Sequence, residues 1–407
     1  MNISSKLEIF SLYILYMMVL ISPLVSIYAG LSIAVFFILV ALTPTIIAFK
    51  NNSWSGVFDL PTYKISLLIL MYSLFSVFWA IDRGESFSLL CRVFIMFIAF
   101  IALFDFLKRL DDIKKNRICF LLTLGFIIAI IAANVEIVTD GFVTKFFRSF
   151  EKKEHIFHLT DLNRGSSYLS LIFWPVFAYF LLSKRWLCAA LIFTITFLTI
   201  FRLESQSSSL AIFLGSLSLL FVFNTGRVGI TLIMILTCVC VFSVAFIANI
   251  MDPAEVYKII PKISNSASEI RLYIWDFSAS VAAKKPFLGW GFNASRAIAV
   301  DESQYVLNGR HPLPLHPHNN ILQIWLELGI VGLCLYTAFI LSIMNNLRKN
   351  FQVKENKLVI CTAFGLLITC FSIGQTGYGI WQFWWLSSIM LSSCLMRANI
   401  NFSKEEI

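Results

Sequence analysis

The histidines of this 407-residue sequence are confined to two polar stretches. They are His155, His158, His311, His316 and His318. A neutral imidazole can take a proton from a hydroxyl group near neutral pH, as a general base does. The His-x-His spacing at 316–318 would also suit a metal ion, but the sequence has no H-E-x-x-H motif and no Cys/His cluster. We therefore expect acid–base chemistry without a metal, and no cofactor.

Polar side chains continue from the last histidine into an apolar run. The segment 316–333 reads HPHNNILQIWLELGIVGL, and Asn320, Gln323 and Glu327 within it share one face of a helix. A polar face inside a bilayer is costly unless it meets protein or water. It either bonds neighbouring helices or lines an outward-facing cavity with His318 at its mouth. We expect the cavity.

Charged and amide side chains also gather near one end of several apolar runs. They are Arg92, Glu136, Arg164, Arg202, Glu204 and Gln206. A charge inside a membrane span is a candidate for function, although arginine can also snorkel to the interface. Arginine binds phosphate through two parallel hydrogen bonds and can stabilise a leaving pyrophosphate. Beside a histidine base, such arginines suit transfer of a glycan from a lipid-linked pyrophosphate to a sugar hydroxyl. This transfer needs no ATP, and the sequence has no P-loop motif.

The elements that position these residues are expected to be membrane helices. The chain is 58% hydrophobic and only 14% charged, whereas soluble proteins carry about 25% charged residues. This composition excludes a soluble globular enzyme and a disordered chain. The formal charge of +9 does not indicate a nucleic-acid partner, because no basic–aromatic ribbon or helix-turn-helix pattern accompanies it. Basic cytoplasmic loops of a membrane protein account for it better.

Twelve apolar runs predict an all-α integral membrane protein with about twelve transmembrane helices. A span needs about 20 apolar residues, and lipid requires its backbone to be helical. The runs are 8–28, 31–48, 62–81, 87–107, 118–138, 166–183, 186–201, 209–223, 228–250, 319–344, 357–374 and 378–397. With no internal repeat, we expect residues 1–407 to form a single polytopic membrane domain.

Basic residues set the predicted orientation. The stretch 108–117, the pair 184–185 and the stretch 345–357 are rich in Lys and Arg and fall on one side of twelve spans. The positive-inside rule makes that side cytoplasmic, together with both termini. The opposite, periplasmic or extracellular side then holds a long loop, 251–318, which we expect to contain short helices.

An ordered set of motifs in and after this loop resembles the signature of the bacterial O-antigen ligase and polymerase superfamily. The set is Arg-x-x-x-Trp, Pro-x-x-Gly-x-Gly, His-Asn-x-x-Leu and Glu-x-Gly-x-x-Gly. Its residues here are Arg271, Trp275, Pro286, Gly289, Gly291, His318, Asn319, Leu322, Glu327, Gly329 and Gly332. Together these motifs span the end of loop 251–318 and residues 319–333.

The resemblance implies a metal-independent glycosyltransferase of the bacterial inner membrane whose active site faces the periplasm. Its donor would be a glycan on undecaprenyl pyrophosphate, and its acceptor lipid A–core for a ligase or another lipid-linked glycan for a polymerase. His318 corresponds to the general base of the family, and Arg271 to an arginine that contacts the pyrophosphate. Asn319, together with Glu327 and Arg92, would support the site. Asn319 or Asn320 can also cap the following helix.

The second arginine of the family is less clear in this sequence. Family ligases often have a Ser-Arg pair where residues 205–209 read Ser-Gln-Ser-Ser-Ser. Arg202, about one turn earlier, is one substitute for pyrophosphate binding, and Arg164 is another. O-antigen ligation is the first prediction and polymerisation the alternative. A polysaccharide flippase, from a different class, would predict inverted repeats and charged groups near the middle of the membrane.

Overall fold

A computed structural model describes residues 3–51, 61–150, 156–259, 267–304, 306, 309–352 and 357–399. Within these ranges the chain is helical, and the one β pairing is an isolated bridge between Val306 and Arg310. The α-helices are α1 (Ile3–Tyr28), α2 (Ile33–Lys50), α3 (Pro61–Ser76), α4 (Arg83–Arg109), α5 (Asp112–Val138), α6 (Phe142–Arg148), α7 (Asn163–Leu182), α8 (Trp186–Arg202), α9 (Gln206–Ile250), α10 (Pro253–Ile259), α11 (Ala267–Ala283), α12 (Asn320–Asn350), α13 (Lys357–Thr376) and α14 (Phe383–Ala398). Short 3-10 helices are η1 (Gly30–Ser32), η3 (Val77–Trp79), η4 (Leu159–Leu162), η6 (Ala294–Arg296) and η7 (Glu302–Gln304).

In the described part of the chain, nine helical segments are long and apolar enough to cross a membrane. This confirms the predicted all-helical, multi-pass membrane protein. The sequence predicts twelve spans, and the difference arises at three helices. Helices α8 and α14 have only 17 and 16 residues, and α9 counts once although it contains two of the predicted runs.

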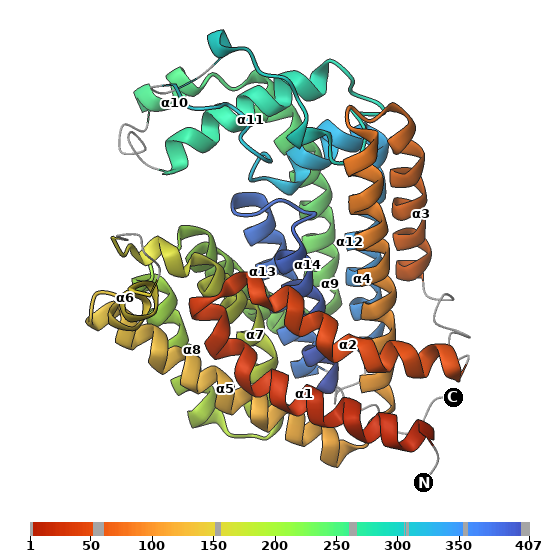
Figure 1. The fold of residues 1–407 in the computed structure, drawn as a ribbon, viewed down its shortest axis with the longest axis vertical. Coiled ribbons are helices and arrows are strands. Elements are labelled where there is room, and N and C mark those ends of the chain that lie inside the picture. The colour runs from red at the N-terminus through yellow and green to blue at the C-terminus, as the bar shows by residue number, and fades with distance from the viewer. Residues whose placement is uncertain are drawn as a thin grey trace.

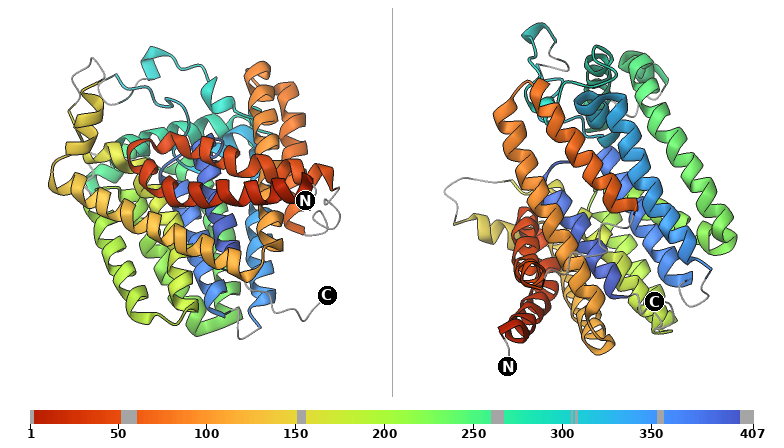
Figure 2. Two further views of the ribbon diagram at one scale, coloured as in Figure 1. Left: turned by 60° about the horizontal axis from the view of Figure 1, so that its bottom comes forward. Right: turned by 90° about the vertical axis from the view of Figure 1, so that its right-hand side faces the viewer.

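Helix α9 is broken at Gly226, whose φ of 60° and ψ of −134° are not helical. Before the break it runs antiparallel to α13, because Ser207 donates a hydrogen bond to the carbonyl of Thr376 and Lys357 lies over the ring of Phe223. After the break the chain turns back along α12, and its last part packs against α11. Figure 2 shows this returning segment beside α12.

Helix α12 is broken in the same way at Gly329, where φ is 65° and ψ is −163°. The segments before and after this glycine, 320–328 and 330–350, fold back on each other, so that the side chains of Asn320 and Tyr336 are in contact. The predicted span 319–344 therefore begins with a short helix that is distinct from the long one. This short helix directly follows the histidines.

Two groups of buried side chains hold the bundle together. The larger one surrounds Trp174, which is fully buried in α7 and donates a 2.8 Å hydrogen bond to the hydroxyl of Thr369 in α13. The second group joins α11 to the short helix of α12 and includes Ile274 and Ile321. In Figure 1, α10 and α11 lie across the end of the bundle at which α3 and α4 meet, and α1 begins at the opposite end. The second group thus fixes the long loop to that end.

Candidate active site

The centre of the site is the tight turn His316-Pro317-His318, called the histidine turn below. His318 has a left-handed backbone with φ of 54°, a conformation that non-glycine residues seldom adopt. Its N–H donates a 3.1 Å hydrogen bond to Nδ1 of His316, and the two ring centroids are 4.2 Å apart. Asn319 then caps the short helix through its side-chain oxygen, which accepts from the N–H of Leu322 at 3.1 Å. The turn therefore ends where the helix begins.

The hydrogen bonds of His318 determine which ring nitrogen is available. Its Nδ1 lies 2.5 Å from the carbonyl oxygen of Gly377; since a carbonyl can only accept, Nδ1 carries the hydrogen. In the neutral ring the lone pair is then on Nε2, which has no hydrogen-bond partner among the described residues. Burial and the positive charge of Arg271 lower the pKa of His318, against an opposing effect of the Gly377 carbonyl. His318 is thus a neutral, half-buried base near pH 7.

Arg271 is brought to His318 by α11. Trp275, one helical turn further on, donates its indole N–H to the carbonyl of Pro317 at 3.0 Å and so attaches α11 to the histidine turn. The guanidinium of Arg271 is half-buried and makes no hydrogen bond or ion pair within the described ranges. Its burial lowers its pKa below the ordinary arginine value, but arginine stays charged in proteins. An unpaired, partly desolvated cation beside a neutral base is suited to an anionic substrate.

The hydroxyl of Tyr378 is influenced by the charges of two arginines, Arg164 and Arg271. Tyr378 lies in the connection between α13 and α14, and its hydroxyl donates to the carbonyl of Asn163 and contacts the hydroxyl of Ser167, both at 3.1 Å. The charges of Arg164 and Arg271 both act on this hydroxyl. Arg164 is exposed at the start of α7. Arg164 and Arg271 therefore both lie within electrostatic reach of the hydroxyl of one half-buried tyrosine.

Glu327 is buried and bonded on all sides rather than lining a cavity. Its exposed fraction is 0%. Its carboxylate accepts hydrogen bonds from the N–H of Asn293 at 3.0 Å, the amide of Gln323 at 3.0 Å, the indole of Trp381 at 2.7 Å and the hydroxyl of Ser295. The sequence predicts that the polar face of α12 lines a cavity. Instead, residues 293–295 and the α13–α14 connection pack against it and form hydrogen bonds with Glu327. Glu327 thus joins residues 293–295 and the α13–α14 connection to the short helix of α12.

The glycines of the motif set allow two backbones to touch. The N–H groups of Trp290 and Gly291 donate to the carbonyls of Leu326 and Glu327 at 2.9 and 2.8 Å. A Cβ on Gly289, whose φ is 69°, would lie 2.4 Å from the Glu327 carbonyl oxygen. Only glycine fits there. The Pro-x-x-Gly-x-Gly and Glu-x-Gly motifs therefore contact each other through their backbones. This contact attaches the loop to α12 at its break.

The remaining predicted residues are less closely tied to the turn. Arg92 bonds to Ser88 in its own helix and lies 5.3 Å from the centre of the Phe383 ring, at the start of α14. Arg202 is the last residue of α8, where it is exposed and has no partner in the described ranges. Among the described residues, no hydrogen bond or ion pair joins Arg202 to His318.

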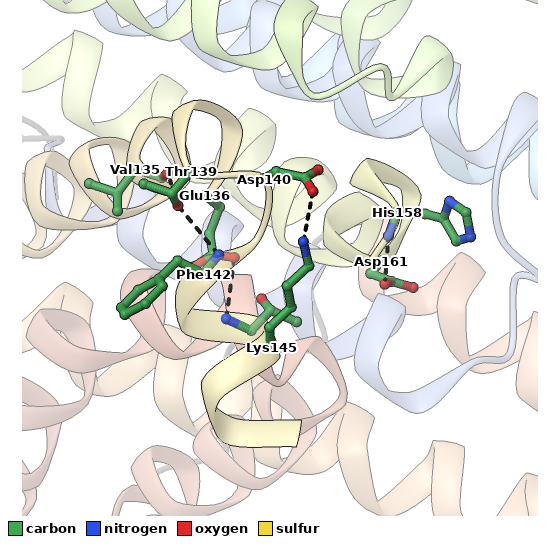
Figure 3. A network of polar contacts seen from close by, with 9 residues as sticks. Val135, Glu136, Thr139, Asp140, Phe142, Lys145, His158 and Asp161 are labelled. Atoms are coloured by element: carbon green, nitrogen blue, oxygen red, sulfur yellow. Dashed lines mark hydrogen bonds and ion pairs between the residues drawn. The ribbon is translucent and has the colours of Figure 1, made fainter. Parts of the chain in front are cut away.

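Glu136 belongs to a separate network, drawn in Figure 3. It is fully buried and accepts from the N–H groups of Val143 and Thr144 at the start of α6, at 3.1 and 3.3 Å. In the same view the N–H of His158 donates to Asp161 at 3.2 Å. These contacts have a structural explanation and do not approach the histidine turn. The other early histidine, His155, lies outside the described residues.

Sequence reasoning missed three contributors to the site. They are Tyr378, the carbonyl of Gly377, and Arg296, whose charge acts on His316. Arg296 follows the Gly-rich stretch after Pro286. Its position within the motif region could therefore have identified it as a candidate site residue. Tyr378 and Gly377 had none, because they are about 60 residues from the histidines in sequence. Within the described residues no group of three or more His, Cys, Asp or Glu is arranged to hold a metal ion.

Comparison with known proteins agrees with the family that the sequence motifs resemble. A family model described as "O-Antigen ligase" matches residues 188–337, which include Arg202, Arg271, His318 and Glu327. The chain is 32% identical over 353 residues to a Rickettsia bellii protein named "Putative polysaccharide ligase", with 83% of this chain and 80% of that one covered. A Rickettsia typhi protein of the same description is 27% identical over 408 residues, covering 95% of this chain and 97% of the relative.

Proposed function

The chain belongs to the O-antigen ligase family, and we propose that it transfers a glycan from undecaprenyl pyrophosphate to a sugar hydroxyl of lipid A–core. The reaction is metal-independent and takes place on the periplasmic side of the inner membrane. One observation carries this proposal: among the described residues, Nε2 of a neutral His318 has no hydrogen-bond partner and lies within electrostatic reach of the guanidinium of Arg271, which has no ion-pair partner there. A base and a phosphate-binding cation are the two groups that such a transfer requires.

The proposed reaction uses these groups in one displacement. Nε2 of His318 takes the proton of the acceptor hydroxyl while its oxygen bonds to the anomeric carbon of the donor sugar. The bond from that carbon to the pyrophosphate oxygen breaks, and undecaprenyl pyrophosphate leaves with the electron pair. Arg271 stabilises the charge on the leaving group, with Arg164 and Arg202 as further candidates. The imidazolium then returns its proton to water.

We further propose that the protein crosses the membrane twelve times. Counting α9 as two spans on account of its break at Gly226, and adding α8 and α14, extends the nine candidates to twelve. Both termini then lie in the cytoplasm, and the long loop with its helices α10 and α11 in the periplasm. The basic pair Lys184 and Arg185 between α7 and α8 falls on the cytoplasmic side, in agreement with the positive-inside rule.

Reconstitution and genetics together test the proposal. Purified protein, supplied with an undecaprenyl-pyrophosphate glycan and lipid A–core in the presence of EDTA, is expected to form a glycan–lipid A–core conjugate. Deletion of the gene is expected to remove all O-chains from the lipopolysaccharide, with lipid-linked polymer accumulating. A core that carries one repeat unit would indicate a polymerase instead. An unchanged lipopolysaccharide ladder would contradict both activities.

A further inference from the structure

We propose that His316 is a positioning residue: its Nδ1 atom holds His318 in the left-handed conformation and so directs Nε2 of His318 at the acceptor hydroxyl. The inference rests on the proposed function of His318 as the base. His316 itself does not touch the substrate. Its effect is transmitted through the backbone of the residue that does.

The backbone of the histidine turn requires such a support. A residue with a β-carbon is strained at a φ of 54°, and Pro317 has a fixed φ that limits how the turn can relax. The N–H of His318 is held by Nδ1 of His316 at 3.1 Å, an interaction of the type by which Asn and Asp side chains stabilise turns two residues on. Without that acceptor, the N–H of His318 loses its partner inside the protein. The ring of His318 would then leave the Gly377 carbonyl.

Protonation states support the same role. Because Nδ1 of His316 accepts an N–H, it carries no hydrogen, and the neutral ring has its hydrogen on Nε2. Burial, together with the neighbouring His318 and Arg296, lowers the pKa of His316 to about 3. The amide nitrogen of Gln382 lies 3.0 Å from Nε2. Because both nitrogens would then carry hydrogen, this tautomer requires the Gln382 amide to turn its oxygen toward Nε2 and away from the Trp384 indole that donates to it. His316 thus stays neutral, and its Nδ1 remains an acceptor, at any pH at which His318 can act as a base.

The surroundings of His316 also separate its role from that of His318. Only 5% of His316 is exposed, whereas His318 is only partly buried. Gly379 packs so closely on its ring that an added Cβ would lie 2.9 Å from Cγ. The ring is therefore enclosed by Gly379, Gln382 and the ring of His318. No hydroxyl of a substrate can reach it without displacing one of them.

Two isosteric substitutions test the role of the Nδ1 atom. His316→Asn places a carbonyl oxygen where Nδ1 was, so the acceptor for the N–H of His318 is kept. His316→Gln places its amide near the position of Nε2 and leaves no acceptor at the position of Nδ1. A second base acting through Nε2 would be destroyed equally by both changes. Folding of each variant is checked by size-exclusion chromatography in detergent.

The expected result is a difference between the two variants in kcat and not in the KM for the donor. His316→Gln lowers kcat by about 10²-fold, the usual cost of misplacing a catalytic group by roughly 1 Å, whereas His316→Asn stays within about tenfold of the wild type. Equal losses in the two variants would overturn the inference, and so would full activity in both. If His316→Gln does not fold, His316→Asn alone decides, because loss of its activity contradicts the proposal.

A measurement without substrate separates this inference from the proposed function. In ¹⁵N-histidine NMR spectra, the signal of His318 is identified by its loss in His318→Ala. The wild type and His316→Asn are expected to show the Nδ1–H tautomer of His318, and His316→Gln the Nε2–H tautomer that free histidine favours. The same tautomer in all three proteins would overturn the positioning role. If the wild type shows no transfer, the proposed function fails, and the tautomers still test the role of His316.

Discussion

The indole of Trp275 donates a 3.0 Å hydrogen bond to the carbonyl of Pro317, and this contact attaches the helix that carries Arg271 to the turn that carries His318. Arg271 precedes Trp275 by one turn of α11 and so lies on the same face of the helix. The charge of Arg271 lowers the pKa of His318, which shows that the two groups share one environment. The Arg-x-x-x-Trp motif therefore contains both the cation that we propose to bind the pyrophosphate and the tryptophan that attaches its helix to the histidine turn.

Removal of the Trp275 anchor should reduce transfer. In Trp275→Phe the Pro317 carbonyl loses its donor, and we expect a loss of about 1 kcal/mol of stability and roughly tenfold in kcat, since α11 and the histidine turn can then separate. Trp290→Phe is the matched control, because it removes a 2.8 Å bond to Val281 that does not reach the turn. Steady-state transfer kinetics measure both. Equal losses of kcat in Trp275→Phe and Trp290→Phe would contradict a specific role of the Trp275 hydrogen bond in positioning Arg271.

The charge of Arg271 should set the acid side of the pH–rate profile. A base is active only when unprotonated, so the rate falls as the pH drops through the pKa of His318. Arg271→Gln removes a positive charge that lowers this pKa, and the acid limb is therefore expected to move to higher pH. Arg271→Lys keeps the charge and should leave the limb in place while raising the KM for the donor, because a lysine cannot form the two parallel bonds. Coincident acid limbs for wild type and Arg271→Gln would contradict the assignment.

The two candidate second arginines are predicted to differ. Arg164 acts on the same tyrosine hydroxyl as Arg271, whereas no contact connects Arg202 to the turn in the described part of the chain. We expect Arg164→Gln to raise the KM for the donor by about tenfold, in the range of one charge-assisted hydrogen bond, and Arg202→Gln to have the smaller effect. Donor titrations with both variants measure this. A larger rise in the KM for the donor in Arg202→Gln than in Arg164→Gln would contradict this prediction and indicate that the pyrophosphate binds at the end of α8.

Glu327 is expected to contribute mainly to the stability of the protein and not directly to the rate of transfer. In Glu327→Gln one carboxylate oxygen becomes an NH₂ group that faces N–H and O–H donors, and each buried donor left unsatisfied costs about 1–3 kcal/mol. We expect a clear fall in the thermal unfolding temperature in detergent, measured by tryptophan fluorescence. Glu8→Gln, at an exposed position near the start of α1, should leave it unchanged. A Glu327→Gln protein with wild-type stability would remove the supporting role.

The helical membrane fold follows from the sequence because lipid leaves the backbone few alternatives. Long apolar runs such as those of α4 and α5 could thus be predicted closely. A capping asparagine, Asn319 or Asn320, could be predicted from its place before a helix, and the structure shows that it is Asn319. The break at Gly329 could not, because an apolar run with a single glycine is compatible with a continuous helix. Its cause is the contact with residues 286–291, which only folding brings near. The pairing of His318 with Gly377 is hidden for the same reason, as it joins segments about 60 residues apart.

The transfer rate of His318→Ala tests the central claim most directly. Purified wild type and variant are compared in single-turnover transfer from an undecaprenyl-pyrophosphate glycan to lipid A–core, with EDTA present and donor and acceptor saturating. Loss of a general base is expected to lower the rate by about 10²- to 10⁴-fold, while donor binding is retained through Arg271. A His318→Ala protein that transfers at the wild-type rate would contradict the account.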